Sequence, residues 1–198
     1  MQVAMTIVAL MLGAAQAPAD VRQLFDSGRY QDVVKAGDQA TADNDRAARV
    51  QYLTAQSYAK LNDGDGAKRT YQRLAESGAG PWASIGKSAV LLMDKQLDQS
   101  LESANQAVSA GDSLPEAHYQ RGIVLMSKME YGEAAGAFTK ATQLDPTFAG
   151  AHYYAGLANY RAKRIDLMTN NFEAFVKLAP NAPERQEVEA ILRTVRGR

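Results

Sequence analysis

The sequence predicts an all-α solenoid of helix–turn–helix repeats, because segments of one length recur along the chain and apolar residues recur at helical spacing within each segment. The segment PEAHYQRGIVLMSKMEYGEAAGAFTKATQLDPTF begins at Pro115 and is followed at Ala149 by AGAHYYAGLANYRAKRIDLMTNNFEAFVKLAPNA. Both segments are 34 residues long, and Gly122 in the first corresponds to Gly156 in the second. This similarity at a fixed period indicates one structural unit that recurs.

The copies follow one another along the chain. They are a partial first copy that ends in LFDSGRYQDVVKAGDQA at residues 24–40, then segments at 48–80, 81–114, 115–148 and 149–182. The second copy is one residue short of the period. The last stretch, PERQEVEAILRTVRGR at residues 183–198, is a charged amphipathic helix of the kind that caps the open end of a repeat array.

The fourth copy shows why each repeat is expected to hold two helices. Its first helix is predicted over residues 115–128, where proline suits the first turn. Its second helix is predicted over residues 131–144 and ends before Asp145-Pro146, because proline lacks an N–H and disfavours helix in the residue before it. Small residues in both helices, with large ones between them, allow close packing.

These residues make the chain resemble the tetratricopeptide repeat (TPR) family. The family pattern has a small residue at position 8, large apolar residues at 11 and 17, alanine at 20 and 27, an aromatic at 24 and proline at 32. The fourth copy supplies Gly122, Leu125, Tyr131, Ala134, Phe138, Ala141 and Pro146. The second copy supplies Ala55, Tyr58, Ala67 and Tyr71. The third copy keeps the small residues Ser88, Ser100, Ala104 and Ala107 but lacks the proline. The fifth copy departs from the pattern at Asn159, Met168 and Phe175, so its two helices are expected to pack differently. The resemblance covers residues 20–182 and implies a right-handed superhelical solenoid with a concave groove.

In this family the groove is lined by positions 2, 5, 9 and 12 of each first helix. Those positions hold Arg49, Tyr52, Gln56 and Ala59, then Trp82, Ile85, Ala89 and Leu92, then Glu116, Tyr119, Ile123 and Met126, then Gly150, Tyr153, Leu157 and Tyr160. The residues predicted to contact a protein or peptide are Tyr52, Gln56, Trp82, Ile85, Tyr119, Ile123, Met126, Tyr153, Leu157 and Tyr160. The core is an equally good place for Leu92, Ile123 and Leu157. The tyrosines, including Tyr154, favour a binding surface because a phenol hydroxyl needs a partner.

Some family members bind the C-terminal carboxylate of heat-shock chaperones with lysine at position 5 and asparagine at 9. Here those places hold Tyr52 and Gln56, Ile85 and Ala89, or Tyr119 and Ile123, so that clamp is absent. An apolar, tyrosine-rich groove suits an extended or helical peptide with apolar side chains. The resemblance therefore implies a non-enzymatic adaptor or scaffold, with assembly of cell-envelope machinery as the expected setting. The alternative is a self-assembling scaffold, a homo-oligomer in which the groove takes another copy's terminal helix.

The first 19 residues carry no charged side chain and resemble a secretory signal peptide. The apolar run from Val3 to Leu12 is shorter than the ~20 residues of a spanning helix, which favours cleavage. Cleavage after Ala19 or Ala15 avoids placing Pro18 beside the cut. We therefore predict export, to the periplasm in a bacterium. An uncleaved segment that anchors the chain to the membrane and a mis-assigned start in a cytoplasmic protein are the alternatives.

Composition and motifs disfavour other functions. Equal numbers of acidic and basic residues, 22 each, and the few short basic runs argue against nucleic acid. GPWASIGKS at residues 80–88 and NDGDG at 62–66 depart from the phosphate and calcium loops they resemble. No nucleophile is placed with a base, so neither catalysis nor a small-molecule substrate or cofactor is predicted. The two histidines, His118 and His152, share a repeat position on successive first helices, on the order of 10 Å apart, so a shared metal ion is not expected.

Overall fold

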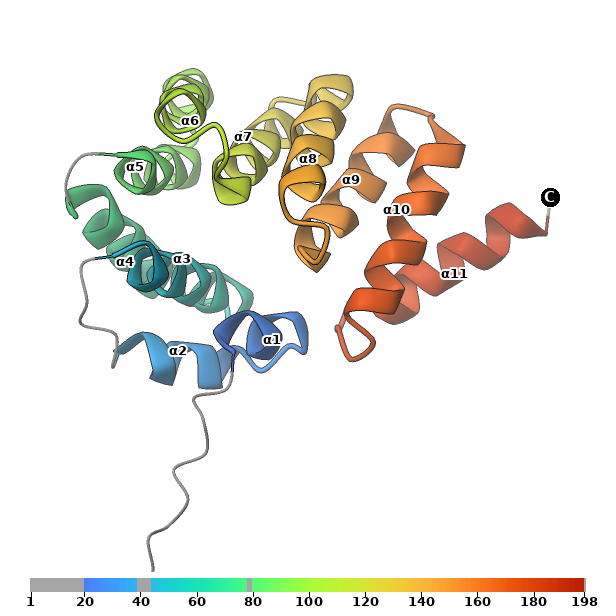
Figure 1. The fold of residues 1–198 in the computed structure, drawn as a ribbon, viewed down its shortest axis with the longest axis horizontal. Helices are drawn as coiled ribbons and strands as arrows, with labels where there is room; N and C mark the ends of the chain where they lie inside the picture. Colours follow the sequence, from blue (N-terminus) through green and yellow to red (C-terminus); the bar gives the residue numbers. More distant parts are fainter. Residues whose placement is uncertain (1–19, 39–43, 78–79, 198) are drawn as a thin grey trace, which may run out of the picture.

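The computed structural model describes residues 20–38, 44–77 and 80–197, which form helices and short connections and contain no β-strand (Figure 1). In chain order the helices are α1 (Val21–Asp26), α2 (Tyr30–Asp38), α3 (Asp45–Lys60), α4 (Gly64–Glu76), α5 (Pro81–Met93), α6 (Leu97–Ala110), α7 (Pro115–Ser127), α8 (Tyr131–Leu144), α9 (Ala149–Arg161), α10 (Ile165–Leu178) and α11 (Arg185–Arg196). The predicted all-α repeat architecture is confirmed. The helix predicted over residues 131–144 is α8, and the helix predicted from residue 115 is α7, which ends one residue earlier than expected.

The two helices of a repeat are joined by the same turn each time. The turns contain one non-glycine residue in the left-handed region, with φ near 60°, at Asn62, Lys95, Met129 and Lys163. The next residue closes the turn across the helix end: the N–H of Glu130 donates to the Leu125 carbonyl at 2.9 Å, and the N–H of Arg164 to that of Asn159 at 2.8 Å. Left-handed geometry costs a side chain about 1 kcal/mol, which this closing bond offsets. The same turn therefore joins the two helices in each of the second to fifth copies.

Inside each pair, a small residue on the first helix allows the second helix to approach closely. A Cβ on Gly122 would lie 2.6 Å from the Phe138 ring, and a Cβ on Gly156 would overlap the Phe172 ring. Both rings are fully buried. In the third copy the contact is polar, since Ser100 Oγ donates to the Ser88 carbonyl at 2.8 Å. The interiors of the fourth and fifth pairs are therefore filled by one large residue against one small one, whereas the third pair brings two small polar residues together.

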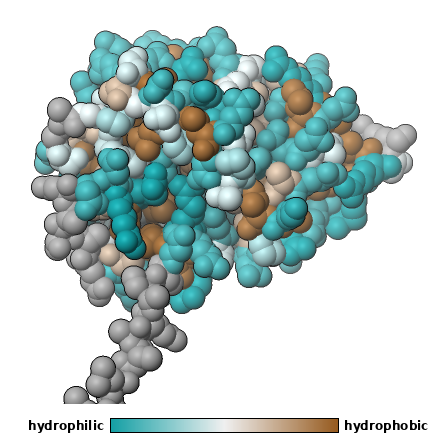
Figure 2. All heavy atoms as spheres, viewed as in Figure 1, coloured by the Kyte–Doolittle hydropathy of each residue, from teal (hydrophilic) through white to brown (hydrophobic). Residues whose placement is uncertain are grey.

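The first helices α3, α5, α7 and α9 contact one another in succession and form the inner layer of a curved array (Figure 1). The face of the molecule seen in Figure 2 is mostly hydrophilic, with smaller hydrophobic areas between the polar side chains. The curvature brings the turn after α1 to the connection before α11, because Gly28 lies against Pro183. Helix α11 packs on α10 and buries Val188 and Leu192, as expected of a capping helix. The array is therefore closed at one side instead of forming an open trough.

The signal peptide predicted at residues 1–19 lies outside the described residues. Among the helices that the structure does describe, none has both the length and the apolar character needed to cross a membrane.

Candidate functional site: a pocket inside the solenoid

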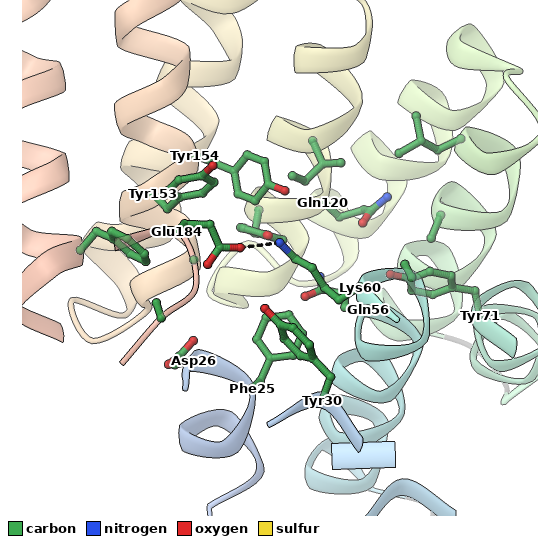
Figure 3. A pocket seen from close by; sticks show the side chains of 18 of the residues that line it. Phe25, Asp26, Tyr30, Gln56, Lys60, Tyr71, Gln120, Tyr153, Tyr154 and Glu184 are labelled. Atoms are coloured by element: carbon green, nitrogen blue, oxygen red, sulfur yellow. Dashed lines mark hydrogen bonds and ion pairs between the residues drawn. The ribbon is translucent and has the colours of Figure 1, made fainter. Parts of the chain in front are cut away.

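A pocket of about 340 Å³ lies on the inner face of the array (Figure 3). Its lining comes from both ends of the chain as well as from the middle: α1 to α5, α7, α9, α10 and the connection before α11 all contribute. The aromatic members of the lining are Phe25, Tyr30, Tyr71, Tyr119, Tyr153, Tyr154 and Phe175. Aliphatic residues on α5 and α7, among them Leu92 and Ile123, complete an apolar wall. This size is at the lower end of the range for ligand-binding pockets, which is about 300–1,000 Å³.

Two aromatic pairs face the pocket from opposite walls. Phe25 and Tyr30 meet edge-to-face with ring centroids 5.4 Å apart, and Tyr153 and Tyr154 do so at 5.2 Å. Figure 3 shows the first pair below the cavity and the second above it. Burial raises the pKa of Tyr153 to about 12 and also raises the pKa of Tyr154. Both hydroxyls therefore stay protonated at neutral pH and can donate hydrogen bonds to a bound segment.

An ion pair crosses the pocket between these walls. Lys60 Nζ, at the end of α3, donates to Glu184 Oε1 at 2.6 Å, and Figure 3 shows this bond between the two aromatic pairs. Burial alone would lower the pKa of Lys60, but the hydrogen bond and negative charge of Glu184 raise that pKa above its usual value. The pair joins residues 124 apart in sequence, so it forms only when the array has closed.

Asp26, at the end of α1, adds a carboxylate to the same lining. Its side chain makes no hydrogen bond or ion pair with the residues that the structure describes. Burial raises the pKa of Asp26 to about 6, although the positive charge of Arg22 acts in the opposite direction. At neutral pH the pocket therefore holds a desolvated carboxylate that is mostly ionised.

Replacing Asp26 by asparagine is expected to stabilise the protein at pH 7 by about 1 to 3 kcal/mol. A carboxyl whose folded pKa is raised binds its proton more tightly in the folded state, so stability is lost as pH rises from about 4 through 6. Urea denaturation of both proteins at pH 7 and pH 4 measures the effect, which should shrink at pH 4. Asp166→Asn, at an exposed position of α10, is the matched control, and an equal gain in that variant would show that the effect is not specific to the pocket.

The contact between α1 and the middle of the helix array depends on Arg22. Its guanidinium donates to Glu116 Oε1 at 2.6 Å and to Asp145 Oδ2 at 3.1 Å, and lies 4.3 Å from the centroid of the Phe148 ring. Glu116 is only 1% exposed and also accepts from Arg49 Nε at 2.6 Å. One buried carboxylate is thus held between two arginines from α1 and α3, which ties the N-terminal helix to the middle of the array.

The structure brings four of the ten predicted contact residues together in the pocket: Gln56, Tyr119, Ile123 and Tyr153. Tyr52, Trp82 and Ile85 are placed in the interior instead, where they are 0%, 6% and 0% exposed. The Tyr52 hydroxyl donates to Gln120 at 3.0 Å, and Trp82 Nε1 donates to Asp45 at 3.2 Å. The Tyr52 ring packs between the Tyr71 and Trp82 rings, with centroids 6.0 and 6.1 Å away. The expectation that these three side chains line an open groove therefore does not hold in this structure.

The other three predicted contact residues, Met126, Leu157 and Tyr160, lie outside the pocket lining. Met126 and Leu157 are partly buried and pack against the core, whereas the Tyr160 side chain is 48% exposed. Whether any of the ten residues contacts a partner stays a prediction.

Sequence reasoning missed the pocket residues that lie outside the groove positions implied by the family resemblance. These are Phe25, Asp26, Tyr30, Lys60, Tyr71, Met93, Gln120, Phe175, Ala182 and Glu184. Most come from the two ends of the chain, which meet only through the accumulated curvature.

The two histidines occupy equivalent positions, as predicted from the repeat. His118 Nε2 contacts the Asp112 carbonyl at 2.8 Å, and His152 Nε2 contacts the Pro146 carbonyl at 3.1 Å. Each bond joins a first helix to the connection six residues earlier. The structural role accounts for both side chains. Among the described residues, no group of three or more histidines and carboxylates is placed to hold a metal ion.

No family model matches the sequence. Several solved protein structures have a similar fold. The TPR protein TTC0263 of Thermus thermophilus has a TM-score of 0.62 at 17% identity, over 88% of this chain and 94% of that chain. YrrB, described as a TPR protein with an unusual peptide-binding site, has a TM-score of 0.53 at 19% identity, over 86% of this chain and 88% of that one. This chain has the TPR fold.

A third TPR structure, the first TPR of Spaghetti (RPAP3) bound to the HSP90 peptide SRMEEVD, has a TM-score of 0.54 at 15% identity, over 59% of this chain and 90% of that chain. At these identities the similarity establishes the TPR fold. Within that fold, the feature to explain here is the closed pocket, where the N-terminal helix and the segment before the capping helix meet.

Proposed function

We propose that the protein is a non-enzymatic adaptor that binds a short segment of a partner protein in the pocket of its TPR array. The observation that carries the proposal is the pocket itself, which is apolar, aromatic and about 340 Å³ in volume. Its tyrosine hydroxyls and the side chain of Gln56 can hydrogen-bond a peptide. Peptide-bound TPR structures such as that of Spaghetti support a protein or peptide partner.

The size and closure of the pocket favour a few inserted side chains over a long peptide in an open groove. Helix α1 and the residues before α11 narrow the space that would otherwise extend along the inner face. A partner would therefore contribute two or three anchoring side chains, the pattern expected of binding hot spots. The alternative of self-assembly through the terminal helix is less favoured, because α11 already buries Val188 and Leu192 against its own chain.

Filling the pocket is the direct test of this proposal. Ala59 lies at the pocket surface near the end of α3, and Ala59→Leu places a larger side chain there without removing any core residue. Once a partner has been captured by crosslinking and purified, its affinity for this variant, measured by calorimetry, is expected to fall at least about tenfold.

Ala190→Leu is the matched control, since Ala190 is on α11 and outside the pocket lining. Equal affinity of wild type and both variants, with folding intact by circular dichroism, would contradict the pocket assignment. Light scattering of the protein lacking residues 1–19 tests the alternative, because a monomer at all concentrations excludes self-assembly through the groove.

We also propose that the protein is exported and acts in assembly of cell-envelope machinery. The support is the uncharged, apolar segment at residues 1–19, which resembles a signal peptide. N-terminal sequencing of the protein from cells tests this, and a mature chain that begins after Ala15 or Ala19 is the expected result. An intact N-terminus in protein from the cytoplasmic fraction would contradict it.

A further inference from the structure

The charges that line the pocket do not balance. Three lining residues carry a charge, Asp26, Lys60 and Glu184, and the last two neutralise each other at 2.6 Å. Asp26 is left without an ion-pair partner among the described residues. The positive charge that acts on it belongs to Arg22, whose guanidinium is already bound to Glu116 and Asp145. The pocket lining therefore has one uncompensated negative charge.

The aromatic walls add to the attraction for a cation. The face of an aromatic ring carries partial negative charge, and a cation within about 6 Å of a ring centroid is attracted to it. Phe25 and Tyr30 on one wall and Tyr153 and Tyr154 on the other present rings around the space beside Asp26 and Glu184 (Figure 3). The Lys60 ammonium, which bridges this space to Glu184, shows that the lining accommodates an alkylammonium group.

A negatively charged guest meets the opposite conditions. Lys60 is committed to Glu184, and the pocket lining contains no other lysine or arginine among the described residues. A carboxylate in this pocket would displace the Lys60 ion pair and would lie near Asp26 without compensation. The pocket therefore disfavours an acidic segment of the kind bound by the first TPR of Spaghetti.

We propose that the pocket selects a partner segment that inserts a positively charged side chain, lysine or arginine, beside apolar ones. The charged group pairs with the Asp26 carboxylate between the aromatic pairs, and the apolar neighbours pack on Leu92, Ile123 and Phe175. This inference rests on the proposed function and specifies the chemistry of the partner.

The position of Asp26 supports this assignment. A partly buried, ionised carboxylate without an ion-pair partner weakens the fold, and such groups concentrate at functional sites. Burial raises the pKa of Asp26 to about 6, and a bound cation would lower that pKa by pairing with the ionised form. The charge that is unfavourable in the protein alone thus becomes favourable in the complex.

The test is a selection of random heptapeptides displayed on phage against the immobilised protein, residues 20–198. Phage that still bind Ala59→Leu are discarded, because they attach outside the pocket. Peptides enriched in lysine or arginine next to apolar residues are the expected result. The same selection on Asp26→Asn should lose the enrichment in basic residues, and the selection on Asp166→Asn should keep it.

The possible failures are distinguishable. Enrichment of apolar peptides without basic residues would overturn this inference and leave the proposed function standing. The absence of any peptide that requires an open pocket would contradict both. An acidic consensus would also overturn the inference, since the pocket would then prefer the opposite charge.

Affinity measurements on a selected basic peptide separate charge from packing. The peptide and a counterpart with norleucine in place of its basic residue are measured by calorimetry against wild type and Asp26→Asn. The variant is expected to bind the basic peptide about tenfold more weakly and the norleucine peptide about equally. An equal loss for both peptides would show that Asp26 acts through packing and not by pairing with the cation.

Discussion

Replacing Glu116 by alanine is expected to lower the free energy of unfolding by about 3 to 5 kcal/mol, the cost of removing one partner from a buried ion pair. The Glu116 side chain is 1% exposed and accepts at 2.6 Å from both Arg22 and Arg49. Without it, both guanidiniums lose a charge-assisted hydrogen bond, and Arg22 keeps its ion pair with Asp145 and its contact with the Phe148 ring. Urea denaturation followed by circular dichroism at pH 7 measures the loss.

Two further variants show what the charged cluster of Arg22, Arg49 and Glu116 does. Glu116→Gln keeps the shape and one acceptor, so its loss should fall between those of wild type and Glu116→Ala. Arg22→Ala should increase hydrogen exchange mainly in α1, because this arginine joins that helix to α7 and to the connection before α9. A loss below about 1 kcal/mol for Glu116→Ala would mean that these ion pairs contribute no more than weak surface pairs. It would contradict their role in holding α1 against the middle of the array.

The repeat fold was predictable because its determinants are local. The helix at residues 131–144 has the bounds of α8, since the turn before it and Asp145-Pro146 after it act within a few residues. Gly122 and Phe138 are both visible in the repeat pattern and meet inside one helix pair. Each copy therefore specifies its own structure, and the copies repeat it.

The pocket was only partly predictable because it depends on how small rotations between repeats add up. Lys60 and Glu184 are 124 residues apart, and their contact requires the ends of the array to meet. Tyr52 and Trp82 were expected on an open groove, but the tight curvature packs their rings 6.1 Å apart, between centroids, inside the array. A repeat pattern identifies which positions face inward, whereas the curvature decides which of those positions remain accessible.

Replacing Gly156 by alanine is expected to lower the free energy of unfolding by about 2 kcal/mol, although alanine favours a helix by about 1 kcal/mol over glycine. The added methyl group would overlap the Phe172 ring, which is fully buried and cannot move away without displacing α10 from α9. Tyr153 lies against both Phe172 and Phe175, so a displaced α10 would also alter the pocket wall. Thermal and urea denaturation measure the loss of stability.

Gly136→Ala is the matched control, since a Cβ at this position in α8 would meet nothing within 4 Å. That variant should gain about 0.5 to 1 kcal/mol from helix propensity alone. The double variant Gly156→Ala with Phe172→Leu tests the steric cause, because the smaller side chain makes room for the methyl group and the combined loss should be less than the sum. Strictly additive losses would show that Gly156 is required for another reason, and a gain in Gly156→Ala equal to that of Gly136→Ala would mean that the helices of this repeat can separate without cost.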